Sequence, residues 1–196
     1  MLKKFFVFFL LTFFSSTAYL AAIEPDIFVQ STVNRASKLL SENITQDEKI
    51  KKLKLIAKDT VDIKGIGFYT LGSMRKNLTN EQKEKYSSLF EKYFLKSFAS
   101  RLSEYTNPEI DVNGKEVLSE NYTIVRSTLK ATSERPEIKI DWRIYTKNPD
   151  NPLIRDLIIE GLSLARTQKE EFASVLNSND NDINALYKSL EKFSNE

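Results

Sequence analysis

The chain of 196 residues contains no cysteine and no histidine. Without cysteine it can form no disulfide, no thiolate nucleophile and no cysteine-ligated metal centre. Without histidine it can build neither a Ser-His-Asp triad nor an ordinary catalytic zinc site, so any enzyme on this chain would depend on carboxylates, lysine, arginine or tyrosine. We therefore expect no enzymatic activity and no cofactor.

Long hydrophobic runs are also scarce, and the longest lies at the N-terminus. Two lysines precede the run FFVFFLLTFF and small residues follow it, which is typical of a secretory signal peptide. We predict a signal peptide over residues 1–22, with cleavage after Ala18 or Ala22, and one domain over residues 23–196. The alternative is an uncleaved membrane anchor, because the uncharged run approaches the ~20 residues that span a bilayer. Both readings imply export.

The sequence has no excess of charge of either sign. It contains 29 basic and 27 acidic residues, and two of the basic residues lie in the predicted signal peptide. A mature surface that is close to neutral offers no electrostatic footprint for nucleic acid. We therefore expect no nucleic-acid partner.

The first half of the mature chain has helical periodicity. Apolar residues recur at helical spacing over residues 26–41, and capping-box sequences at Thr45 and Thr79 predict the starts of two further helices. Between them, residues 59–77 contain three glycines, so a helix there needs close packing against a neighbour. The helix after Thr79 carries a broad apolar stripe, which suits either a core or a cavity wall. This stripe comprises Tyr86, Leu89, Phe90, Tyr93, Phe94, Phe98, Leu102 and Tyr105.

Strand patterns follow. Residues 110–118 have the form of a hairpin, because Asn113-Gly114 tolerates the positive φ angles of a tight turn. Residues 122–131, 138–145 and 153–159 are rich in β-branched and aromatic side chains. In the second of these runs, apolar and polar residues alternate, so one strand face collects the large apolar side chains Ile138, Ile140, Trp142 and Ile144.

Helical spacing returns after the strands. The order of helices, strands and helices predicts an α+β fold, in which helices pack on one face of a curved, antiparallel-rich sheet. Incomplete closure of these two layers would leave an apolar cavity that suits acyl chains. Periodicity alone does not distinguish such a cavity from a filled core.

Asp141, Asp156 and Glu160 are the carboxylates within the apolar strand segments. A general acid or base would require one of them to be desolvated in a pocket. Alternation directs Asp141 away from the face that carries Trp142. Glu160 precedes a helix, which favours a structural role at the helix N-terminus or in a pair with an arginine.

Anion binding has weaker candidates. Arg75, Arg143 and Arg166 could donate to a phosphate group at the mouth of a cavity. Residues 65–67 (GIG) lack the later glycine and the Lys-Ser/Thr ending of a phosphate-binding loop. We therefore expect no nucleotide site.

Several motifs together resemble a known family. The run IRDLIIEGLSL over residues 154–164 contains the element D-x-x-x-E-G-x-S, and the runs WRI at 142–144 and TQKEEFASV at 167–175 flank it. Upstream positions fit the same pattern, namely Asp62, Ile63, Leu71, Gly72, Arg75, Gln82, Phe90 and Leu102. The sequence resembles the MlaC family, also called toluene-tolerance auxiliary components, over essentially the whole mature chain. Val61, Met74 and Lys169 depart from common family residues.

This resemblance implies a periplasmic phospholipid carrier. Such a carrier passes lipid between an outer-membrane lipoprotein and porin complex and an inner-membrane ABC transporter, which maintains the lipid asymmetry of the outer membrane. The acyl chains would be buried between sheet and helices, with the head group outside. We predict that the lipid-binding residues are Leu71, Phe90, Phe94, Ile140, Trp142, Ile144, Leu157 and Ile159.

Three alternatives stay open at this point. The first is a carrier of hopanoids or another apolar ligand. The second is a cone-shaped α+β enzyme that uses a pocket carboxylate, and the third is a structural adaptor whose layers are filled by side chains.

Overall fold

The computed structural model describes residues 22–195, so the predicted signal peptide lies almost entirely outside the described residues. Within this part of the chain, no helix is both long and apolar enough to cross a bilayer. The elements in chain order are α1 (Pro25–Leu40), α2 (Gln46–Thr60), α3 (Ile63–Thr70), the 3₁₀ helix η1 (Gly72–Lys76), α4 (Asn80–Ser103), β1 (Ile110–Ser119), β2 (Tyr122–Leu129), β3 (Ile138–Tyr145), β4 (Leu153–Ile159), β5 (Leu162–Ser163), α5 (Leu164–Asn177) and α6 (Ile183–Asn195).

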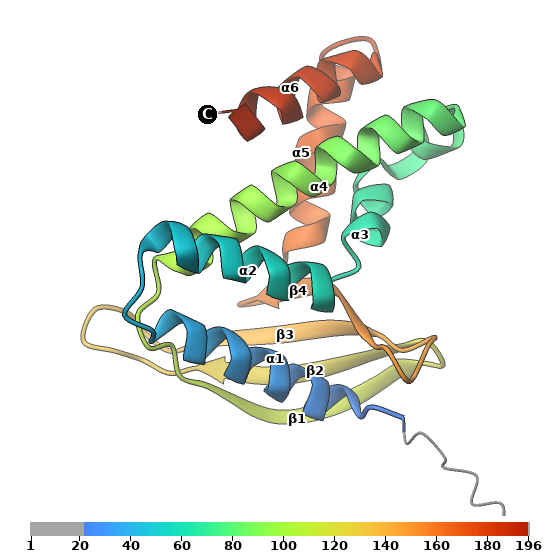
Figure 1. The fold of residues 1–196 in the computed structure, drawn as a ribbon. Coiled ribbons are helices and arrows are strands. Elements are labelled where there is room, and N and C mark those ends of the chain that lie inside the picture. The colour runs from blue at the N-terminus through green and yellow to red at the C-terminus, as the bar shows by residue number, and fades with distance from the viewer. Residues whose placement is uncertain (1–21, 196) are drawn as a thin grey trace, which may run out of the picture.

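The five strands form one antiparallel sheet in the order β1-β2-β3-β4-β5, and the sheet does not close into a barrel. The helices gather on one side of it, with α1 along the sheet, α5 rising from the level of β4, and α4 and α6 further away (Figure 1). Helix α1 packs against β1 and β2, whereas α3 and α5 pack against β4. The predicted α+β fold is therefore confirmed.

Local signals place most helix starts correctly. Thr45 and Thr79 each complete a capping box, in which the hydroxyl accepts from the backbone N–H three residues later and the Glu48 or Gln82 side chain accepts from the cap backbone. The glycine-containing segment forms the short helix α3. A Cβ on Gly67 would lie 2.7 Å from the Phe90 ring, so the absence of a side chain lets α3 approach α4 closely.

The predicted hairpin within residues 110–118 is wrong. Strand β1 runs without interruption from Ile110 to Ser119, and Asn113-Gly114 lies at a register shift, which is a bulge opposite β2. The turn comes later, between Ser119 and Tyr122. Pairing with the length of β2 outweighs the local turn preference of Asn-Gly, because sheet formation depends on cross-strand partners.

A single large hydrophobic cluster joins the sheet to the helices. It contains residues from α1 to α6 and from β2, β3 and β4, and a second, smaller cluster lies between α1, α2 and α4. The side of the sheet that faces these helices thus forms one wall of the main core.

Candidate functional site

An aromatic stripe on α4 forms the helical wall of the candidate site. The rings of Tyr86, Phe90, Phe94 and Phe98 follow one another at four-residue spacing, with centroid separations of 5.8, 6.1 and 5.6 Å. Tyr86 and Phe90 are fully buried, but Phe94 and Phe98 are only half-buried. The stripe therefore becomes more exposed toward the C-terminus of α4, although Phe94 and Phe98 still pack against the core.

The opposite wall is one face of the sheet. Trp142 lies between Val125 and Leu157 in the register, and the next row on the same face places Ile140 beside Ile159. Directly paired residues of antiparallel strands share a face. Ile144 is fully buried, whereas Leu157 and Ile159 are half-buried, so cover decreases along this wall as well.

The two walls lose cover at the same end of the fold. Helix α4 ends at Ser103, and the chain enters the sheet at Ile110. In that row Ile110 and Ile138 are half-buried, whereas Leu129 between them is buried. At the other end, Ile154 pairs with Ile144 and bridges to Val61 immediately before α3. The layer between helices and sheet is thus closed near α3 and less covered near Ile138.

The structure brings the predicted lipid-binding residues together. Leu71, Phe90, Ile140, Trp142 and Ile144 belong to the main hydrophobic cluster, and Phe94 and Leu157 pack against it. Ile159 neighbours Ile140 in the register. Their role in lipid binding stays a prediction.

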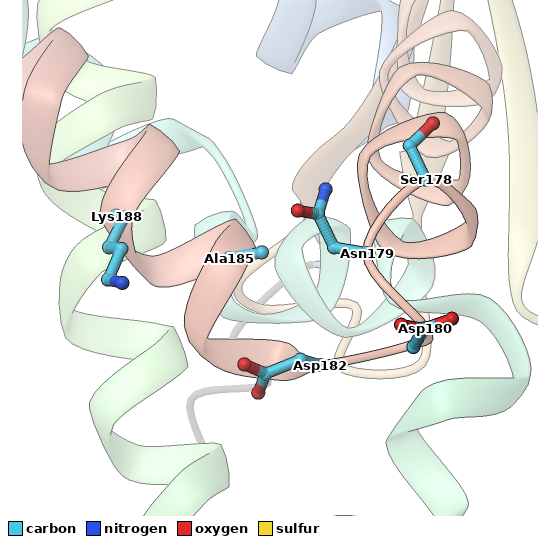
Figure 2. A pocket seen from close by; sticks show the side chains of 6 residues that line it. All are labelled: Ser178, Asn179, Asp180, Asp182, Ala185 and Lys188. Atoms are coloured by element: carbon cyan, nitrogen blue, oxygen red, sulfur yellow. The ribbon is translucent and has the colours of Figure 1, made fainter.

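Two surface hollows lie elsewhere. One, of about 530 Å³, is formed by the loop between α5 and α6, where Asp180 and Asp182 lie among other polar side chains (Figure 2). The other, of about 410 Å³, lies on the outer side of α1. Neither is lined by the predicted residues. Side chains such as Phe90 occupy the space between the layers, so an acyl chain there requires the half-buried side chains to move apart.

One hydrogen-bonded pair sits within the apolar wall and was missed from the sequence. The indole Nε1 of Trp142 donates to Ser127 Oγ at 2.8 Å, and this hydroxyl donates to the Ile140 carbonyl at 3.1 Å. The pair satisfies the indole N–H and holds the indole in one orientation. Because Trp142 is the only tryptophan in the chain, its fluorescence reports on this wall.

Burial also shifts a phenol at the closed end of the stripe. Tyr86 shares a hydrogen bond of 2.8 Å with the Thr70 hydroxyl, and Thr70 donates to the Gly67 carbonyl. Desolvation raises the pKa of the Tyr86 phenol well above its ordinary value. The phenol therefore stays neutral and acts as a structural hydrogen-bonding group.

The D-x-x-x-E-G-x-S element forms the turn from β4 into α5. Asp156 is 4% exposed and accepts hydrogen bonds from Ser163 Oγ at 2.6 Å and from the backbone N–H of Ala165 at 3.0 Å. Ser163 in turn caps α5. Glu160 and Gly161 both have positive φ, as a two-residue hairpin of the mirror-image type requires. Each residue that defines the element thus has a structural role in this turn.

These contacts show what each of the three candidate carboxylates does in the fold. The partner predicted for Glu160 is wrong, because its side chain accepts from the backbone N–H of Lys139 at 2.5 Å, while Ser163 and Asp156 satisfy the helix N-terminus. Asp141 lies opposite Arg126 in the strand register and on the face away from Trp142, as alternation predicts. None of the three carboxylates lines either surface hollow. Among residues 22–195, no group of acidic side chains converges as a metal site.

The arginine that anchors the site is not one of the predicted three. Arg155 donates to Asp62 at 2.6 Å and to the Tyr122 hydroxyl at 2.6 Å, and its guanidinium lies 3.6 Å from the centroid of the Tyr145 ring. Asp62 also caps α3 by accepting from Gly65. This cluster ties the start of α3 to the sheet. An arginine inside the apolar run IRDLII was the available sequence signal.

The predicted anion-binding arginines lie on three separate elements. Arg75 is exposed on η1, and Arg166 is exposed in the first turn of α5. Arg143 lies on β3, next to Trp142, and points to the opposite face of the sheet. The three side chains therefore do not form one site.

Comparisons with known proteins agree with this architecture. The sequence profile of the family described as "MlaC protein" matches residues 30–192. The chain is 26% identical over 190 residues to the intermembrane phospholipid transport system binding protein MlaC of Haemophilus influenzae, and the alignment covers 90% of this chain and 87% of that protein. The fold is similar to that of the phospholipid-binding protein from Ralstonia solanacearum, solved with a phospholipid. The TM-score is 0.74 at 19% identity, and the match covers 88% of this chain and 97% of the other.

Proposed function

The chain belongs to the MlaC family, and from this membership we propose that it is a non-enzymatic phospholipid carrier of the periplasm. The observation that carries the proposal is the apolar layer that is closed near α3 and loses cover toward Phe98 and Ile138. The names of the Haemophilus relative and of the Ralstonia protein support a phospholipid as the ligand.

The apolar walls are sufficient for useful affinity. Each buried methylene contributes about 0.8 kcal/mol, so ~10 methylenes between the stripe on α4 and the sheet contribute about 8 kcal/mol. That free energy corresponds to a dissociation constant of about 1 μM. Side-chain movement and lost ligand entropy reduce this figure, and the remaining methylenes of two acyl chains offset the loss.

Membership of the family supports a proposal for the transport partners. We propose that the carrier exchanges lipid with an outer-membrane lipoprotein and porin complex and with an inner-membrane ABC transporter, which maintains outer-membrane lipid asymmetry. The leader over residues 1–22 would direct export. A chain that moves freely between two membranes must have its leader removed.

The first test identifies the ligand. Protein exported and purified from its native host is extracted with organic solvent, and the extract is analysed by mass spectrometry. We expect phospholipid in a stoichiometric amount. A hopanoid in its place would support the alternative carrier, and an empty extract with no uptake from vesicles would reject lipid carriage.

The second test asks which face of the sheet binds. Leu157 and Ile158 are adjacent, half-buried and on opposite faces of β4. We expect Leu157→Lys to abolish uptake of brominated phospholipid, measured by quenching of Trp142 fluorescence, because it places a charge in the acyl-chain wall. Ile158→Lys is the matched control and should retain uptake. Equal losses in both variants would contradict the assignment of the wall.

A further inference from the structure

A row of side chains crosses the helix-facing side of the sheet and becomes more exposed toward β5. In the register, Ser127 pairs with Ile140, Ile140 with Ile159, and Ile159 with Leu162, so all four lie on one face. Ser127 is buried, Ile140 is 9% exposed, Ile159 is half-buried and Leu162 is 59% exposed. The row thus leads from the core to the β5 edge. Beyond Ser127, all of its side chains are apolar.

From this row we infer that the acyl chains enter and leave the site across the β4–β5 edge, over Ile159 and Leu162. The inference rests on the proposed function and adds the route of exchange. Each methylene exposed to water costs about 0.8 kcal/mol, so a route that keeps apolar contact lowers the barrier to exchange. Two adjacent strand spacings separate Ile140 from Leu162, a distance of about 10 Å.

Two other approaches to the layer are obstructed. Helix α1 covers β1 and β2, and Lys115 of β1 forms ion pairs with Glu24 and Asp26 at the start of α1. At the α3 end, Val61 bridges to Ile154, and Asp62 pairs with Arg155. An acyl chain at either place would have to separate ion pairs or backbone hydrogen bonds.

The local structure allows Leu162 to move without loosening α5. Strand β5 has two residues and only two register pairs with β4, so few backbone hydrogen bonds hold it. The following residue, Ser163, is held by its hydrogen bond to the buried Asp156. Leu162 can therefore shift aside while the start of α5 stays in place.

Because the chain contains no native cysteine, a single cysteine can be introduced and labelled to test this route. Leu162→Cys and Leu55→Cys are made separately, since Leu55 is a leucine of α2 with a similar exposure of 63%. Each folded protein is reacted with a bulky polyethylene-glycol maleimide. Uptake of dibrominated phosphatidylcholine from vesicles is then followed by quenching of Trp142 fluorescence, before and after labelling.

We expect the label at position 162 to slow uptake about tenfold, which corresponds to ~1.4 kcal/mol in the barrier, with the same final extent of quenching. The label at position 55 should leave the rate unchanged. Equal rates for both labelled proteins would overturn the route, and so would a reduced final extent at an unchanged rate. No quenching in any protein, including the parent, would instead reject the proposed function.

Discussion

Replacing Phe94 with alanine should weaken lipid binding more than it lowers the free energy of unfolding. Replacing Phe90 with alanine should lower the free energy of unfolding more than it weakens lipid binding. The two residues are one helical turn apart on α4, and their ring centroids are 6.1 Å apart. Phe90 is 1% exposed and contacts rings from α4 and α5, but Phe94 is half-buried. Their chemistry is identical, so the difference isolates the effect of position.

The expected magnitudes follow from burial. Phe90→Ala leaves a cavity in the core and should lower the free energy of unfolding by about 3–5 kcal/mol. Phe94→Ala removes a partly covered ring and should cost about 1–2 kcal/mol. An acyl chain that covers ~80 Å² of the Phe94 ring gains about 2 kcal/mol, so the same substitution should raise the dissociation constant for lipid about 30-fold.

Urea unfolding followed by far-ultraviolet circular dichroism measures the first quantity, and quenching of Trp142 by brominated phospholipid measures the second. Phe90→Leu replaces Phe90→Ala if the latter does not fold. The reasoning is refuted if Phe94→Ala loses as much stability as Phe90→Ala and binds lipid normally, because the whole stripe would then be core.

Three further predictions concern the surrounding contacts. Ser127→Ala leaves the buried indole N–H of Trp142 without its acceptor and should cost about 1–3 kcal/mol in urea unfolding; an unchanged midpoint would show that the hydrogen bond is dispensable. Ser163→Ala removes the cap of α5 and should cost about 1 kcal/mol, and its effect should be less than additive with Asp156→Asn because the two side chains share a hydrogen bond; strict additivity would argue against coupling. Burial raises the pKa of Tyr86 above its ordinary value of 10.0, so the unfolded chain loses that proton first and stability should fall as the pH rises above about 10, by up to ~1.4 kcal/mol per pH unit. Tyr86→Phe should reduce this slope in urea titrations between about pH 8 and 11, and equal slopes would exclude Tyr86 as the source.

Features with local causes were predictable from the sequence. The capping boxes at Thr45 and Thr79 involve residues three positions apart, and the alternation in residues 138–145 reflects the two-residue period of a strand. These patterns placed the helix starts and the apolar face of β3 correctly. The family resemblance could be recognised for the same reason, because its motifs are short contiguous runs of sequence.

Features that depend on distant partners were not predictable. Asn113-Gly114 forms a bulge because β2 offers a long partner for β1, and Arg155 is an anchor because Asp62 and Tyr122 lie within reach only after folding. Ser127 carried no signal of its role beside Trp142. Each of these contacts joins residues from different elements.

The sequence by itself determined the class of protein: a cysteine- and histidine-free α+β chain with an aromatic helix stripe and an apolar strand face. Only the tertiary structure decided which parts of those surfaces are core and which border the candidate site. Periodicity treats Phe90 and Phe94 alike, although one is buried and the other is half-buried. Spacing likewise does not show that Ile140 is covered while Leu162, two strands away, is exposed. Cover depends on how the helices pack against the sheet, as α1 does on β1 and β2 and α3 and α5 do on β4, which is a property of packing between elements.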